Sequence, residues 1–162
     1  MATGRLMEEV LFVHVGTSGF IASYADMTTG NPTTDIVSMK NYNRCTFALI
    51  YGAGATGTAT VTVESCDTTV PGTATAIAFN YRVCTTPDTW GEVTACAATG
   101  FTTAANADKM YLIEVNAAEL YSTDSFVRLQ FTEVDSTAVD GTVIAIMSQP
   151  RYIQGIPLTA LA

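Results

Sequence analysis

The sequence TATVTVES, at residues 58–65, alternates β-branched or small residues with polar ones at a period of two. Successive side chains of a β-strand point to opposite faces, so the pattern predicts a strand that buries Val61 and Val63. The polar residues between and after them, including Glu64, then lie on the opposite face. A second strong strand pattern, RCTFALIY, precedes it at residues 44–51. Together the two segments indicate a protein built from sheets.

Similar short segments rich in β-branched and aromatic residues continue along the chain. In residues 75–84 the side chains of Ile77, Phe79, Tyr81 and Val83 recur at a period of two, which predicts one strand with a single buried face. The remaining predicted strands are residues 9–15, 35–40, 110–115, 126–134 and 142–148.

Turn-forming residues separate these segments at short intervals, and no stretch of ten residues has a clean helical periodicity. The best helical candidate, residues 116–120, is one short turn. Seven or eight short strands with frequent turns predict an all-β fold, a β-sandwich of jelly-roll or related type. At 162 residues the chain is expected to form a single domain, residues 1–162.

The two ends differ from the middle of the chain. Residues 1–12 are predicted to form an N-terminal arm, and residues 150–162 (PRYIQGIPLTALA) a C-terminal tail. The two prolines of the tail favour extended or edge geometry. Such an apolar tail either folds back over the core or inserts into a neighbouring subunit, and the sequence leaves both open. No apolar run approaches the roughly 20 residues of a membrane-spanning helix, so no membrane partner is expected.

Charged residues make up only 14% of the chain, against about 25% in an ordinary soluble domain. Thr and Ala contribute 27 and 22 residues instead. Either neighbouring molecules cover much of the exterior, or the threonines are there for their strand propensity. The net charge is −8 and the seven basic residues are scattered, so nucleic-acid binding is not expected.

Four cysteines, Cys45, Cys66, Cys84 and Cys96, lie too far apart in sequence for the paired spacing of a structural zinc site. In a protein made in the cytoplasm, free thiols are favoured over disulfides. Cys66 and Cys84, which are predicted to flank neighbouring strands, are the first pair to test for a bond.

No catalytic, cofactor or metal site is predicted. The sequence GAGATG at residues 52–57 has the G-x-G-x-x-G form, but a strand pattern follows it, so we expect a hairpin loop. His14 lies in an apolar, alternating segment and is expected at the core edge or surface, not as a catalytic base beside Ser18. Asp135 and Asp140 flank a loop, where Asx turns explain them better than calcium does.

Trp90 is the single tryptophan. With Tyr81, Tyr111 and Tyr121 it is a candidate for a platform on which a sugar ring stacks. The alternative is that these residues pack in the core or anchor an interface.

Several segments together resemble a family of small proteins that tailed bacteriophages and prophages encode among their head genes. The segments are SMKNY at residues 38–42, with the Gly-, Ala- and Thr-rich stretch that follows, IEV at 113–115 and PRY at 150–152. The resemblance covers residues 36–152. It implies a virion structural protein, a decoration or cement protein on the outside of the capsid, made in the host cytoplasm. The implied partners are the major capsid protein and further copies of the chain, as a homotrimer.

The two ends and Trp90 are expected to carry the contacts. The predicted interface residues are Arg5, Leu6, Leu11, Phe12, Trp90, Arg151, Tyr152, Ile156 and Leu158. Two alternatives remain at this point: another virion component (neck, tail or head fibre), or a carbohydrate-binding or adhesin module. An enzyme is not expected.

Overall fold

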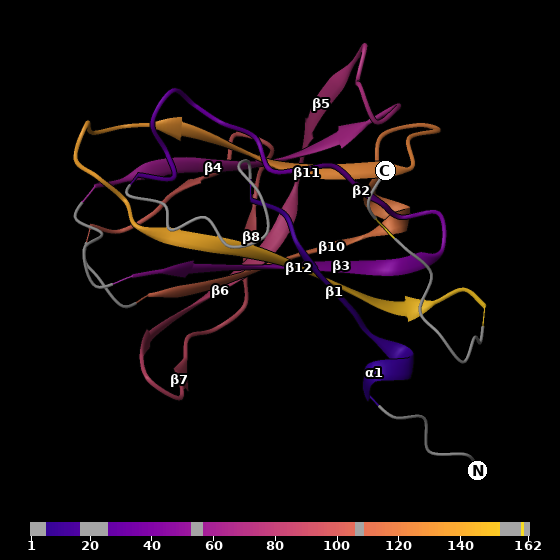
Figure 1. Cartoon of the computed structure of the whole chain (residues 1–162), viewed down its shortest axis with the longest axis horizontal. Coiled ribbons are helices and arrows are strands. Elements are labelled where there is room, and N and C mark those ends of the chain that lie inside the picture. Colours follow the sequence, from indigo (N-terminus) through magenta and orange to yellow (C-terminus); the bar gives the residue numbers. More distant parts are fainter. Residues whose placement is uncertain (1–5, 17–25, 53–56, 106–108, 153–159, 161–162) are drawn as a thin grey trace.

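The computed structural model describes residues 6–16, 26–52, 57–105, 109–152 and 160. Two antiparallel sheets pack face to face, which confirms the predicted all-β sandwich (Figure 1). Sheet A has the order β1 (Leu11–His14), β12 (Gly141–Pro150), β3 (Tyr42–Tyr51), β10 (Met110–Asn116), β6 (Phe79–Thr86) and β7 (Thr89–Trp90), with β8 (Thr94–Cys96) also paired to β6. Sheet B has the order β2 (Val37–Ser38), β11 (Phe126–Glu133), β4 (Ala59–Cys66) and β5 (Ala74–Ile77), with β9 (Phe101–Thr102) also paired to β4.

The core lies between the sheets, where alternate residues of the facing strands meet. Val61 and Val63 of β4 are fully buried, as their period of two predicts. Phe47 of β3, Ile113 of β10 and Leu129 of β11 are fully buried with them. Burial of such a side chain contributes about 1.5–3 kcal/mol, so this apolar layer is the main source of stability.

Residues 75–84 do not form one strand, contrary to the prediction. The chain leaves sheet B after Ile77 and enters sheet A at Phe79, so the segment becomes β5 and β6 in different sheets. Ile77 and Phe79 are both buried between the sheets. The apolar period of two therefore continues across the crossing at Ala78, and periodicity alone cannot reveal the break.

The glycine-rich residues 52–57 do not close a hairpin either. They connect β3 in sheet A to β4 in sheet B, and residues 53–56 lie outside the described part of the chain. A Cβ at Gly57 would overlap the carbonyl oxygen of Thr137. A glycine is therefore required here because another loop passes against the backbone.

The chain ends depart in part from the predicted arms. Leu6–Glu9 form a single helical turn, α1, and Leu11–His14 form β1 at the edge of sheet A, so Leu11 and Phe12 belong to the sandwich. In the tail, Ala160 is buried and its carbonyl oxygen accepts a hydrogen bond from the Ser38 N–H at 2.7 Å. At this residue the chain lies back on its own domain, beside β2.

Three short strands, β7, β8 and β9, have no counterpart in the sequence prediction, because two or three residues give no detectable alternation. The predicted helical turn at residues 116–120 is present as the 3-10 helix η1 (Ala117–Glu119). Its first turn is closed by the carboxylate of Glu119, which accepts a hydrogen bond from the Asn116 N–H at 2.7 Å.

Candidate interaction surface

His14 and Asp135, two of the residues considered as catalytic or metal-binding candidates, each have a polar partner within the chain. His14 Nε2 lies 3.0 Å from the hydroxyl of Thr142 on the neighbouring strand, while Ser18 is outside the described residues. Asp135 accepts a hydrogen bond from the Thr137 N–H at 2.8 Å, and hydrogen bonds from Thr137 hold the pKa of this carboxyl below its usual range. In the described residues, no three His, Cys, Asp or Glu side chains gather as metal ligands. Across the same residues, no helix has the length and apolar character needed to cross a membrane.

All four cysteines are unbonded. Cys66 lies on β4 in sheet B and Cys84 on β6 in sheet A, so the two do not flank neighbouring strands as the sequence prediction assumed. Burial raises the pKa of Cys66 to about 11, and burial also raises the pKa of Cys45 and of Cys96. Cys96 is the only one of the four that is not buried.

Alkylation of the folded chain should therefore add a single label, at Cys96. Cys45, Cys66 and Cys84 are buried, so the reagent does not reach their sulfur atoms in the folded chain, whereas Cys96 is partly exposed. Intact mass after treatment with iodoacetamide, followed by peptide mapping, measures this; the same treatment in denaturant should add four labels. Two or more labels added at equal rates in the native protein would contradict the burial of the other thiols.

Trp90 and the three tyrosines do not form a common platform. Tyr111 is 2% exposed and its ring lies in the core. Tyr81 stacks on Phe101 of sheet B, with ring centroids 4.1 Å apart and planes 2° apart. Tyr121 follows η1 and is exposed. Trp90 instead lies under the guanidinium of Arg82, 4.7 Å from the ring centroid.

The predicted interface residues fall into three groups. Arg5, Ile156 and Leu158 lie outside the described residues. Leu11 packs against the core, while Arg151 and Tyr152 are exposed just beyond β12, where the Arg151 N–H donates to the Asn41 carbonyl at 2.9 Å. Phe12 and Trp90 lie on the outer face of sheet A, the face turned away from sheet B, and Leu6 lies on α1 beside β12.

This outer face carries apolar side chains that the sequence prediction did not single out. The strand register places Ile144 of β12, Ala48 of β3, Leu112 of β10 and Arg82 of β6 in one row across the sheet. Ile50 and Met110 are paired in the next such row, and Phe12 is paired with Ile146 on the other side. In Figure 1, α1 and β7 project from sheet A on this side, so they flank the face at its two ends.

A signal for this face was present in the sequence. In TVIAIMS, residues 142–148, five consecutive residues are apolar, where a strand with one solvated face would alternate. The segment FALI in β3 has the same character. Such runs indicate strands that are covered on both faces, and in this structure sheet B covers only one of them.

The charged groups on the outer face of sheet A are paired within the face. The carboxylate of Glu114 lies 3.7 Å from the guanidinium of Arg44, and Arg82 stacks over Trp90. Although the chain carries 15 acidic residues, Glu114 is the single acidic residue on strands β1, β12, β3, β10 and β6. These charged side chains therefore already have partners within the chain, and the face does not require a charged binding partner.

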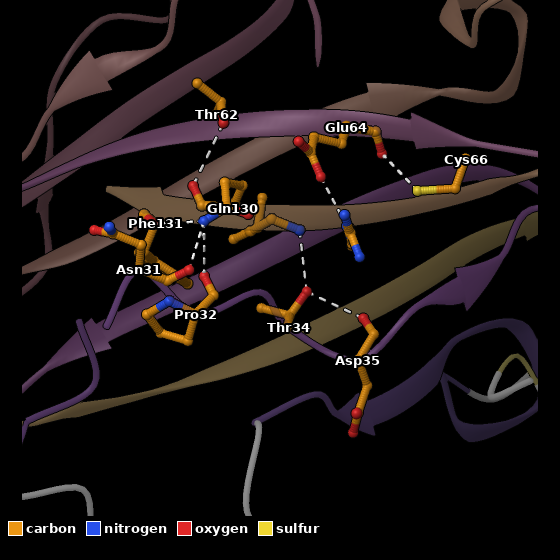
Figure 2. A network of polar contacts seen from close by, with 11 residues as sticks. Asn31, Pro32, Thr34, Asp35, Thr62, Glu64, Cys66, Gln130 and Phe131 are labelled. Atoms are coloured by element: carbon orange, nitrogen blue, oxygen red, sulfur yellow. Dashed lines mark hydrogen bonds and ion pairs between the residues drawn. The ribbon is translucent and has the colours of Figure 1, made fainter. Parts of the chain in front are cut away.

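The outer side of sheet B has a different character. Arg128 donates to the carboxylate of Glu64 at 2.7 Å, and Thr62 and Gln130 lie on the same side. Residues 31–35 run along the edge of β11, where the amide of Gln130 donates to the carbonyl of Asn31 at 2.8 Å (Figure 2). The hydroxyl of Thr34 accepts from the Leu129 N–H at 3.0 Å (Figure 2). The side chains on this side are polar, and they hydrogen-bond to other residues of the same chain.

The class that the fold defines is an antiparallel β-sandwich with one polar outer face and one outer face on which apolar and polar side chains are mixed. Comparison with known proteins finds no protein family whose model matches the chain, and no match among curated proteins.

Proposed function

We propose that this protein is a structural component of a tailed-phage virion, a capsid decoration or cement protein that binds the outside of the head. The observation that carries the proposal is the contrast between the two outer faces of the sandwich. Apolar side chains on the outer face of a sheet suit a contact with other proteins, because exposed apolar patches mark interaction surfaces. The resemblance of residues 36–152 to phage head-gene products supports the same assignment.

The charge of the chain fits this location. A net charge of −8 keeps the chain away from packaged DNA, and it suits a partner with basic groups on the outer capsid surface. In this proposal the major capsid protein is the principal partner, and further copies of the chain form a homo-oligomer. The protein is made in the host cytoplasm and is carried on the capsid surface of the virion.

In the proposed role, binding of the chain is thermodynamically linked to assembly of the capsid lattice. A protein that binds the assembled lattice, but not free capsid subunits, stabilises the lattice by its binding free energy. Several copies held together by symmetry add avidity without new contacts.

Co-sedimentation with empty heads of the phage that encodes the chain tests the proposal. We expect the chain to pellet with heads in many copies per head, and to remain in solution with dissociated capsid subunits. A neck, tail or fibre component would instead bind in a few copies at one vertex or not at all. No binding to heads, together with glycan binding that Trp90→Ala abolishes, would replace the proposal with the carbohydrate-binding alternative.

A further inference from the structure

Strand β5 forms an open edge of sheet B. It pairs with β4 from Ala74 to Ile77, and no other strand of the described residues pairs with it. The backbone N–H and C=O groups of an antiparallel strand alternate between its two sides, so every second residue of β5 directs both groups away from β4. Ala74 and Ala76 are exposed, and Figure 1 shows β5 projecting from the layers of the sandwich.

The sequence of β5 does not protect this edge. Natural proteins protect exposed edges with charged residues, prolines or bulges, because an unpaired strand is a template for pairing with another chain. Residues 74–77, ATAI, have no charge and no proline, and their register with β4 is unbroken. The opposite edge of sheet B is closed by its own chain. There the Thr34 N–H donates to the Leu129 carbonyl at 2.9 Å, and the Ser38 N–H donates to the Ala160 carbonyl at 2.7 Å.

A hollow lies beside the edge at β5. It has a volume of about 550 Å³ and is lined by the end of β5, the crossing into β6, part of β8 and the residues that end and follow η1. Four of its lining side chains are small, those of Ala76, Ala78, Ala95 and Ala98. Small lining side chains leave room for those of a partner. Since Ala76 and Ile77 belong to both β5 and the hollow, a strand paired with β5 places alternate side chains over the hollow.

The charged side chains around the hollow are acidic. Glu119 lines it and is exposed, and Asp124 lies in the following turn, where its N–H donates to the Tyr121 carbonyl at 3.0 Å. The segments that surround the hollow, residues 74–80, 94–98 and 117–124, contain no Lys or Arg. A partner segment with a basic side chain is therefore attracted here, whereas a second copy of the chain, with net charge −8, is repelled.

We propose that β5 and this hollow bind an extended segment of another protein that carries a Lys or Arg, and that the segment adds to sheet B as a further strand. Main-chain hydrogen bonds to β5 provide the affinity, and alternate side chains of the segment enter the hollow and provide the selectivity. The basic side chain of the segment lies near Glu119. The proposal does not depend on the cement role, because the chemistry of the segment alone defines the partner.

Selection from a library of random short peptides on the purified full chain tests the proposal. We expect the selected peptides to carry a Lys or Arg among alternating β-branched residues, and to slow the alkylation of Cys96, which lines the hollow. Ala76→Lys should weaken binding of the best peptide by roughly tenfold or more, because it brings like charges together at the edge. Ala76→Glu is the matched control at the same exposed position and should bind the peptide at least as tightly as the wild type.

Two N-methylated versions of the best peptide, methylated at alternate residues, test the backbone pairing. A strand directs only every second N–H toward its neighbour, so one version should lose binding and the other should keep it. Equal binding of the two versions would overturn strand addition. A thermal melt establishes that both Ala76 variants are folded.

Three further results would overturn the proposal. The first is a selection that yields no peptide able to protect Cys96, or only peptides without a basic residue. The second is binding that Ala76→Lys leaves unchanged. The third is protection of Cys96 that rises with the concentration of the chain alone, which would assign the edge to a second copy.

Discussion

Tyr111→Ala should reduce the free energy of unfolding by about 3–5 kcal/mol, the usual cost of removing a buried aromatic ring. The ring of Tyr111 lies between the sheets, with centroids 5.7 Å from Tyr51 and 5.5 Å from Phe101. Its hydroxyl oxygen also accepts a hydrogen bond from the Ala104 N–H at 2.9 Å. Since domains of this size are stable by about 5–15 kcal/mol, the loss would be a large part of the total.

Urea denaturation followed by tryptophan fluorescence measures this effect. Tyr121→Ala is the matched control, because Tyr121 is 58% exposed and its loss should cost within about 0.5 kcal/mol. Tyr111→Phe separates the two contributions: it keeps the ring and removes the hydroxyl, for an expected loss of about 1 kcal/mol. Equal effects of Tyr111→Ala and Tyr121→Ala would show that Tyr111 is not in the core.

Gly100→Ala should destabilise the protein by about 2–5 kcal/mol, from two separate causes. Gly100 has φ +78°, a left-handed conformation that costs a residue with a Cβ about 1–2 kcal/mol. The added Cβ would also overlap the carbonyl oxygen of Val61 and lie 2.7 Å from Cγ2 of Thr62, and overpacking adds about 1–3 kcal/mol. The turn between β8 and β9 would then be pushed away from β4.

Gly72→Ala provides the control for Gly100→Ala in the same thermal or urea experiment. Gly72 has ordinary φ, and the nearest atom to a new Cβ is the carboxylate Oδ2 of Asp67 at 3.7 Å. This substitution should be neutral or slightly stabilising, since it restricts the unfolded chain without strain. If Gly100→Ala were as stable as Gly72→Ala, the close packing of this turn on β4 would be wrong.

The sequence predicts the sandwich because short segments rich in β-branched and aromatic residues, some of them clearly alternating, are separated by frequent turns. Val61 and Val63 lie on the predicted face of β4, and the helical turn at residues 117–119 is where the pattern indicated. The division of residues 75–84 between two sheets was missed because Ile77 and Phe79 keep their period across the crossing. Which sheet a strand joins depends on pairing between segments far apart in the chain, and local periodicity has no information on it.

The candidate surface could be predicted only in part. Phe12 and Trp90 were predicted as interface residues, and the structure places both on the outer face of sheet A. Tyr111 belongs to the core and Tyr81 packs against it, so neither joins Trp90. The apolar residues in the middle of this face are Ile144, Ala48 and Leu112, which the register of three strands brings into one row. Those residues are ordinary strand residues in sequence, and only the pairing shows that they are neighbours.

Thermal rupture of empty heads tests the proposed cement role most directly. Heads of the phage that encodes the chain are heated with and without saturating amounts of it, and rupture is followed by light scattering. If the chain is a cement protein, the rupture temperature rises with occupancy until every site is filled, because the chain binds the intact lattice in preference to free subunits. Heads that rupture at the same temperature with and without the chain would contradict the proposal.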